Sequence, residues 1–152
     1  MPTYVCSLAK HSVNDRQKAA IAEAIAHVHC EETGAPSFFV QVVFEEKESS
    51  DRYLGGSCET KHVWVRGDIR SGRTEAQRNA LMLRIMREVS RITKVKEEDV
   101  WVYLNSLNPT DMVEYGHVLP LPGKEAEWFD SLPASLQDYL KGLGTSRETF
   151  TL

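Results

Sequence analysis

Hydrophobic residues follow two spacings along this chain, and each spacing predicts one type of element. After residue 12, apolar side chains recur three or four positions apart at Ile21, Ile25 and Val28, which is typical of one buried helix face. Segments rich in valine and aromatic residues flank this helix at residues 3–8 and 38–44 and predict strands. The chain therefore opens with a predicted strand, helix and strand.

The same order of elements returns after a shift of 60 residues. Residues 62–65 and 100–104 predict strands, and the helix between them has its own apolar face. The residue pairs that match under this shift include Val5 with Val65, Gln17 with Gln77, Ala20 with Ala80, Ile25 with Ile85, Thr33 with Thr93 and Val42 with Val102. A duplicated strand–helix–strand unit explains more of these matches than chance does.

Capping patterns and helix-breaking residues predict where the helices begin and end. Ser12-Val-Asn-Asp15 matches the pattern of a capping box before the first helix, and Thr74-Glu-Ala-Gln77 matches it before the second. Gly34 and Pro36 are expected to end the first helix.

The segments outside the two units are predicted to be irregular. Residues 45–60 are polar and predict a loop or hairpin around Gly55-Gly56. Residues 106–152 predict turns, one short helix over 134–143, and a tail over 145–152 that is either mobile or an arm onto a neighbouring copy.

These elements predict a single α/β (α+β) domain made of two fused β-α-β units, over residues 2–45 and 62–105. A strand–helix–strand crossover joins parallel strands of one sheet, so we expect a four-stranded mixed sheet with both helices on one face. The other face of such a sheet lacks a covering layer, which predicts a symmetric oligomer.

Composition and charge exclude several classes of protein. The 152 residues are 41% hydrophobic and 26% charged, as in ordinary globular domains, and the net charge of −4 argues against nucleic-acid binding. No apolar run is long enough to span a bilayer, and polar residues interrupt the first apolar ones, so a cytoplasmic location is expected. The three cysteines predict neither a disulfide framework nor a metal site.

Pro2 is the first candidate for chemistry. If Met1 is removed, Pro2 becomes a secondary amine at the start of the chain. Primary α-amino groups titrate near about 8, close enough to neutrality to exchange protons or attack carbonyls. If Met1 stays, the Pro2 nitrogen is an amide and this chemistry is absent.

Further candidates are scattered along the sequence. Arg70 and Arg73 flank a Ser-Gly pair before the second helix, where guanidinium groups and the helix N-terminus can bind one anion. His29 lies on the apolar side of the first helix, Tyr103 lies in the last predicted strand, and Glu114 lies in a predicted loop. Considered singly, each of these residues has an ordinary structural explanation.

Together, these residues resemble the tautomerase superfamily and, more narrowly, the cis-3-chloroacrylic acid dehalogenase family. The segments that carry the resemblance span nearly the whole chain: Pro2-Thr-Tyr4, Ala24-Ile-Ala-His-Val-His29, Ile69-Arg-Ser-Gly-Arg-Thr74, Val100-Trp-Val-Tyr103, Met112-Val-Glu-Tyr-Gly116 and Glu127-Trp-Phe-Asp130. The resemblance implies a tautomerase fold, a homotrimer, a small carboxylate substrate and no cofactor.

The resemblance also implies residue roles. Pro2, Glu114 and Tyr103 correspond to catalytic positions of the family, and His29, Arg70 and Arg73 correspond to its substrate-binding positions. The implied reaction is hydration of a short unsaturated acid, by which a 3-haloacrylate or an acetylenic acid becomes malonate semialdehyde. The Arg70–Thr74 stretch is more similar to homologues that dehalogenate poorly, so efficient dehalogenation is not implied.

Two other functions are compatible with the sequence. In the first, a neutral Pro2 acts as the base of a tautomerase or decarboxylase on a 2-oxo acid or its enol. In the second, Met1 is retained and the chain is a trimeric binding protein without catalysis. The protonation state and the processing of the terminus separate these functions from hydration.

Overall fold

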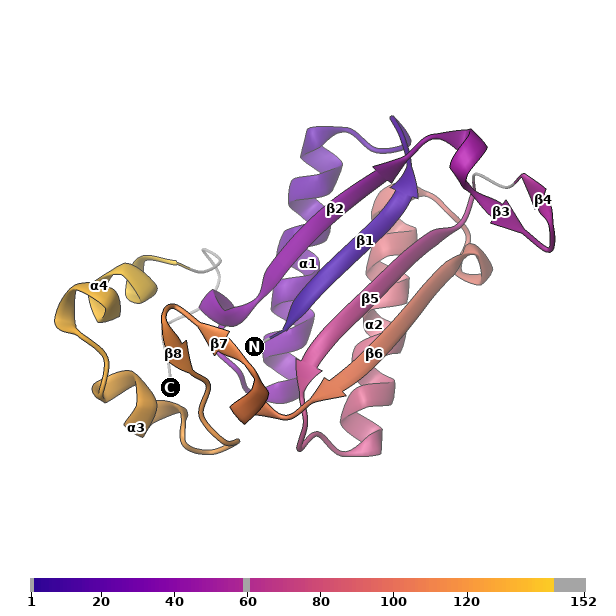
Figure 1. Cartoon of the computed structure of the whole chain (residues 1–152). Helices are drawn as coiled ribbons and strands as arrows, with labels where there is room; N and C mark the ends of the chain where they lie inside the picture. The colour runs from indigo at the N-terminus through magenta and orange to yellow at the C-terminus, as the bar shows by residue number, and fades with distance from the viewer. Residues whose placement is uncertain (1, 59–60, 144–152) are drawn as a thin grey trace.

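The computed structural model describes residues 2–58 and 61–143, in which one sheet carries two long helices on the same face (Figure 1). The sheet has four strands in the order β2-β1-β5-β6. Its strands are β1 (Thr3–Ala9), β2 (Gln41–Lys47), β5 (Val63–Arg70) and β6 (Val100–Leu107), and its helices are α1 (Asp15–Thr33) and α2 (Glu75–Thr93).

The sheet is mixed, as the sequence predicted. β1 and β2 are parallel, β5 and β6 are parallel, and the two units meet where β1 pairs antiparallel with β5. The 60-residue repeat continues into two short hairpins, which follow β2 and β6 respectively. The first is formed by β3 (Tyr53–Leu54) and β4 (Ser57–Cys58), and the second by β7 (Val113–Glu114) and β8 (His117–Val118).

The first helix begins two residues later than the capping pattern suggested. Asn14 is its N-cap, and the capping box is completed by Gln17 rather than by Asp15. The Ser12 hydroxyl is occupied elsewhere, since it donates to the Ala9 carbonyl at 2.6 Å in the turn after β1. The second helix has the predicted box between Thr74 and Gln77.

The predicted strand over 38–44 is also shifted. Ser37–Phe39 forms a 3-10 turn (η1), and the strand starts at Gln41. Phe38 and Phe39 leave the sheet because both are buried in a separate apolar cluster beneath the C-terminal segment. The other 3-10 turns are η2 (Ser49–Asp51), η3 (Glu97–Asp99) and η4 (Pro109–Asp111).

Three other predicted boundaries differ from the structure. The expected loop over 45–60 contains the end of β2 as well as the first hairpin, and β5 and β6 run on to Arg70 and Leu107. These strand ends carry polar residues that hydropathy does not mark as strand, but backbone pairing between β5 and β6 continues through them. β5 therefore delivers Arg70 to the edge of the domain.

The main core lies between the sheet and the helices, and the long helices contribute Ile21, Ile25, Leu81, Ile85 and Val89 to it. Tyr4 crosses this core under β5, where Gly67 makes room for its ring. A Cβ atom at Gly67 would lie 2.5 Å from Tyr4 Cε1, so the phenol can be buried only if residue 67 lacks a side chain. Cys6 is buried in the same core.

The C-terminal segment forms a second cluster beside the sheet. It contains α3 (Glu125–Asp130), which the sequence did not predict, and α4 (Ala134–Gly142), which matches the predicted helix. Its buried residues are Phe38, Phe39, Leu119, Phe129, Leu132 and Leu140. The predicted tail over 145–152 lies outside the described residues. Within the described ranges, no helix is long and apolar enough to cross a membrane.

Candidate active site

A cavity of about 480 Å³ opens where the beginnings of β1 and β2 face the β7–β8 hairpin. Its lining residues are Thr3, Phe38, Phe39, Val40, Gln41, Met112, Val113, Glu114 and Tyr115. Pro2 is buried at the adjoining end of β1, where its carbonyl accepts a hydrogen bond from the Gln41 amide at 3.0 Å. The start of β1 and Glu114 thus belong to one region, and Figure 1 shows β7, the strand that contains Glu114, beside the start of β1.

Glu114 is held in this region by an unusual turn. Tyr115 and Gly116, which join β7 to β8, both have positive φ angles, 53° and 80°. A bulky residue rarely adopts such a conformation, and residues that do so cluster at functional sites. The Tyr115 hydroxyl donates to the Phe38 carbonyl at 2.8 Å, which fixes the turn to the second cluster.

The protonation of Glu114 is influenced by opposing effects. Burial raises the pKa of its carboxyl group, while the positive charge at the amino terminus and that of Arg70 oppose the rise. The net effect is a pKa above the ordinary value. A carboxylate with a raised pKa is a better general base near neutral pH than an exposed one.

His29 is a neutral, buried imidazole. Burial lowers its pKa to about 3, and the charges of Arg73, the amino terminus and Arg70 add to this effect. Its Nδ1 lies 2.8 Å from the Tyr4 hydroxyl. Burial also raises the Tyr4 pKa, so the phenol stays protonated and its O–H can donate a hydrogen bond to Nδ1. The neutral ring then carries its own proton on Nε2, where it can serve as a hydrogen-bond donor.

Arg70 is nearly inaccessible, with 4% of its surface exposed. Its Nη1 donates to the Pro120 carbonyl at 2.9 Å, and its Nη2 pairs with Glu125 Oε1 at 2.5 Å. Burial alone would raise the Glu125 pKa, but the hydrogen bond from Arg70, two backbone hydrogen bonds and the charge of Arg70 together outweigh it and lower the pKa below the ordinary value. The pair is therefore ionised.

Arg73 differs from Arg70 because its guanidinium group is not used in hydrogen bonds or ion pairs among the described residues. Its carbonyl accepts a hydrogen bond from Arg78, but its guanidinium has no hydrogen-bond or ion-pair partner within the described part of the chain. Burial and the charge of Arg70 lower its pKa, whereas Glu125 and Tyr4 oppose that change. Arg73 therefore lies near Arg70 and offers free donors.

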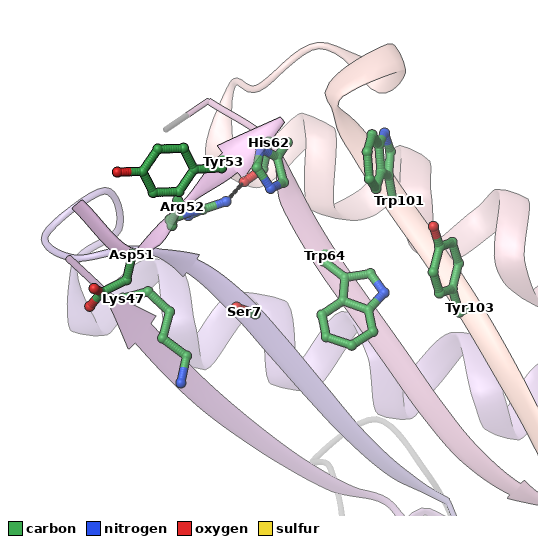
Figure 2. A pocket seen from close by; sticks show the side chains of 9 residues that line it. All are labelled: Ser7, Lys47, Asp51, Arg52, Tyr53, His62, Trp64, Trp101 and Tyr103. Atoms are coloured by element: carbon green, nitrogen blue, oxygen red, sulfur yellow. Dashed lines mark hydrogen bonds between the residues drawn. The ribbon is translucent and has the colours of Figure 1, made fainter. Parts of the chain in front are cut away.

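Tyr103 does not join these groups within one chain. It lies on β6, on the face of the sheet that no helix covers, and 52% of its surface is exposed. Figure 2 shows it beside Trp64 and Trp101, at the edge of a second cavity of about 360 Å³. The structure thus brings five of the six candidates to one end of the sheet and leaves Tyr103 outside that group.

Comparison with known proteins shows the family and the fold of this chain. Residues 1–131 match the family described as putative oxalocrotonate tautomerase enzyme. The solved structure of N1, a member of the cis-3-chloroacrylic acid dehalogenase family, is 38% identical to this chain, with a TM-score of 0.89. That likeness covers 93% of this chain and 99% of N1. The chain belongs to the tautomerase superfamily.

More distant structures share the tautomerase fold. An asymmetric trimer of wild-type fused 4-OT is 20% identical over 76% of this chain and 94% of its own, with a TM-score of 0.72. A malonate semialdehyde decarboxylase inhibited by 3-bromopropiolate is 18% identical over 86% of this chain and 99% of its own, with a TM-score of 0.66. No curated protein matches the sequence.

The two halves of this superfamily member differ in their chemical groups. Under the 60-residue shift, Glu114 falls on Leu54, Arg73 falls on Val13, and Pro2 falls on His62. Only one end of the pseudo-symmetric sheet therefore carries this set of ionisable groups.

Sequence reasoning missed three residues that support the site: Tyr4, Tyr115 and Glu125. A signal for Tyr115 was present, because the repeat aligns it with Gly55, at a turn position that favours glycine. No comparable signal marks Glu125, which is 55 residues from Arg70.

We expect the Gly72→Ala variant to be destabilised. Gly72 has a φ of 98°, and an added Cβ would lie 2.9 Å from Cγ of Pro122. The strained backbone is expected to lower the free energy of unfolding by about 1–3 kcal/mol, as measured by urea denaturation. The control is Gly142→Ala, where an added Cβ meets nothing within 4 Å. Equal stability of both variants would show that the close contact with Pro122 is unimportant.

Proposed function

We propose that this chain is a cofactor-free hydratase of short α,β-unsaturated carboxylates. The observation that supports this most is the convergence of one carboxylate, Glu114, and two guanidinium groups, Arg70 and Arg73, on the end of β1 where Pro2 lies. Such a set can bind an anion, activate water and supply a proton in one place.

Binding of the substrate carboxylate is assigned to the basic side of the site. Arg73 has free donors, Arg70 keeps those that are not used by Pro120 and Glu125, and His29 can donate from Nε2. These groups withdraw electron density from the double or triple bond, which makes C3 electrophilic.

The general acid and the general base are assigned to the side of the site that is opposite the arginines. Glu114 accepts a proton from water as the water oxygen bonds to C3, and protonated Pro2 donates its proton to C2. Propiolate gains one water to give an enol, which becomes malonate semialdehyde. A 3-haloacrylate gains one water to give a halohydrin, which loses hydrogen halide to give the same product.

Turnover of propiolate tests this function directly. Malonate semialdehyde is expected to form, with a rate that saturates with propiolate concentration. Absence of turnover on propiolate and on cis-3-chloroacrylate, by protein that begins with Pro2, would contradict the proposal. Intact mass spectrometry must accompany the assay, because retention of Met1 leaves an amide at Pro2 and favours a binding protein without catalysis.

A tautomerase or decarboxylase is the second candidate function. The nearby charges of Arg70 and Arg73 favour a neutral amine at the terminus, which would act as a base on a 2-oxo acid or its enol. Titration of 15N-labelled Pro2 separates the two candidates. A pKa well below neutrality would reject the acid role and support the base.

The uncovered sheet face supports assembly into a trimer, in which we place Tyr103 at the site of a neighbouring copy. Trp64 lies on this face with Trp101 and Tyr103 (Figure 2), and 52% of the Tyr103 surface is exposed. Covering these aromatic side chains with a second copy would remove apolar surface from water. There the Tyr103 hydroxyl would help Glu114 orient water.

Subunit mixing tests the assignment of Tyr103. Tyr103→Phe and Glu114→Gln homotrimers are each expected to be strongly impaired, whereas a mixture refolded together should regain activity at about a quarter of its sites, because each site draws on two chains. The control is a Glu114→Gln protein mixed with Glu114→Gln/Tyr103→Phe, which should stay impaired. If the first mixture also stays impaired, Tyr103 does not act across the interface.

A further inference from the structure

The end of β5, which carries Arg70, and the loop after it, which carries Arg73, are held by one segment from outside the duplicated units. The Pro120 carbonyl accepts a hydrogen bond from Arg70, the Pro122 ring packs where Gly72 lacks a side chain, and Glu125 pairs with Arg70. Leu119, just before this segment, is buried in the second apolar cluster, so the segment is anchored. Residues 120–125 thus form part of the anion-binding region.

Glu125 adds a negative charge to this region, and it comes from a segment that lies outside the two repeated units. It is mostly buried, with 18% of its side chain exposed, and it pairs with a guanidinium that is 3% exposed. Charges in such a site are screened weakly, so the carboxylate cancels much of the positive field of Arg70. Glu127, two residues away, pairs on the surface with Lys124 and has no such effect.

The two arginines are therefore not equivalent. Arg70 is fixed in place and balanced by a carboxylate, whereas Arg73 has a guanidinium without a partner within the described ranges. An incoming carboxylate meets one uncompensated cation, and it does not have to displace Glu125 from Arg70.

We propose that Glu125 sets the affinity of the anion site by pairing with Arg70, which leaves Arg73 as the principal guanidinium for a substrate carboxylate. The identity of the anion as a substrate rests on the proposed function, but the charge balance itself does not. The consequence is moderate affinity for a single carboxylate, which favours release of an acidic product from the same site.

Binding of propionate, an unreactive short monocarboxylate, tests this proposal by isothermal titration calorimetry at low ionic strength. Glu125→Gln keeps an acceptor oxygen for Arg70 but removes the charge. A charged group within a few ångströms of another typically shifts its pKa by about one unit, which is equivalent to a tenfold change in an equilibrium constant. We therefore expect Glu125→Gln to bind propionate about tenfold more tightly. Glu125→Asp keeps the charge and should bind like the unmodified protein, as should the surface control Glu127→Gln.

Unchanged or weaker propionate binding by Glu125→Gln would overturn the proposal, since a purely structural role predicts weakening. If this variant does not fold, Arg70→Gln/Glu125→Gln provides a second test, because it removes the pair together and leaves the net charge unchanged. It should lose less affinity than Arg73→Gln, since the net charge of the site is unchanged and only the spare donors of Arg70 are lost. Loss as large as that of Arg73→Gln would contradict the assigned roles.

These results are distinguishable from failure of the proposed function. Tighter propionate binding by Glu125→Gln in a protein that does not hydrate propiolate would retain the inference and reject the hydratase. Hydration of propiolate by the unmodified protein, together with unchanged propionate binding by Glu125→Gln, would retain the hydratase and reject the inference about Glu125.

Discussion

Glu114→Gln is expected to lower kcat for hydration of propiolate by about 10²–10⁴-fold, the usual contribution of a general base. Glutamine has nearly the same shape as glutamate and can still hydrogen-bond to water, but it cannot accept the proton. The affinity for the substrate carboxylate should change little, because that group is assigned to the arginine side of the site. Steady-state kinetics and propionate binding measure the two effects separately.

The control for this variant is Glu98→Gln, an exposed position in η3 that pairs with Lys96 at the surface. It should retain full activity. If Glu114→Gln instead weakens propionate binding as much as it lowers kcat, Glu114 supports the structure of the pocket and is not the base.

Arg73→Ala is expected to raise KM and lower kcat together, since the guanidinium both anchors the carboxylate and polarises the substrate. The fold should remain intact, because the Arg73 guanidinium has no ion-pair partner among the described residues. Arg70→Ala should impair catalysis in the same direction and also destabilise the protein. It leaves Glu125 buried without its partner, which costs about 3–5 kcal/mol.

Urea denaturation of both variants, together with kinetics on propiolate, checks this contrast. Arg91→Ala is a suitable control, since Arg91 is an exposed arginine on α2 that pairs with Glu88. Similar unfolding free energies for Arg70→Ala and Arg73→Ala would show that the Arg70–Glu125 pair has no structural role. Unchanged kinetics in both variants would show that the anion site has been assigned to the wrong residues.

The duplicated core could be read from the sequence because its signals are local. The apolar spacing around Ile25 and Ile85 defines one buried face on each helix, and Thr74 and Gln77 cap the second helix as predicted. The start of β2 could not be read in this way. Phe38 is apolar enough for a strand, but it packs against the distant Phe129 in the second cluster.

The candidate site was only partly predictable. Its residue types were recognisable through the resemblance to a family, although no local pattern brought His29 near Arg73. The hydrogen bond between Tyr4 and His29 depends on the space left by Gly67 on another strand. The separation of Tyr103 from the other candidates follows from the alternation of side chains along β6, which puts Tyr103 on the uncovered face and Val102 and Leu104 against the core.

By itself, the sequence determined the two β-α-β units, their mixed sheet and the presence of a proline at position 2, a carboxylate and two guanidinium groups, because periodicity, capping and residue chemistry act over short distances along the chain. Only the tertiary structure decided which arginine is neutralised and which is free. That difference depends on the packing of residues 120–125 against the loop over 70–73, and no local rule specifies a contact between segments 55 residues apart.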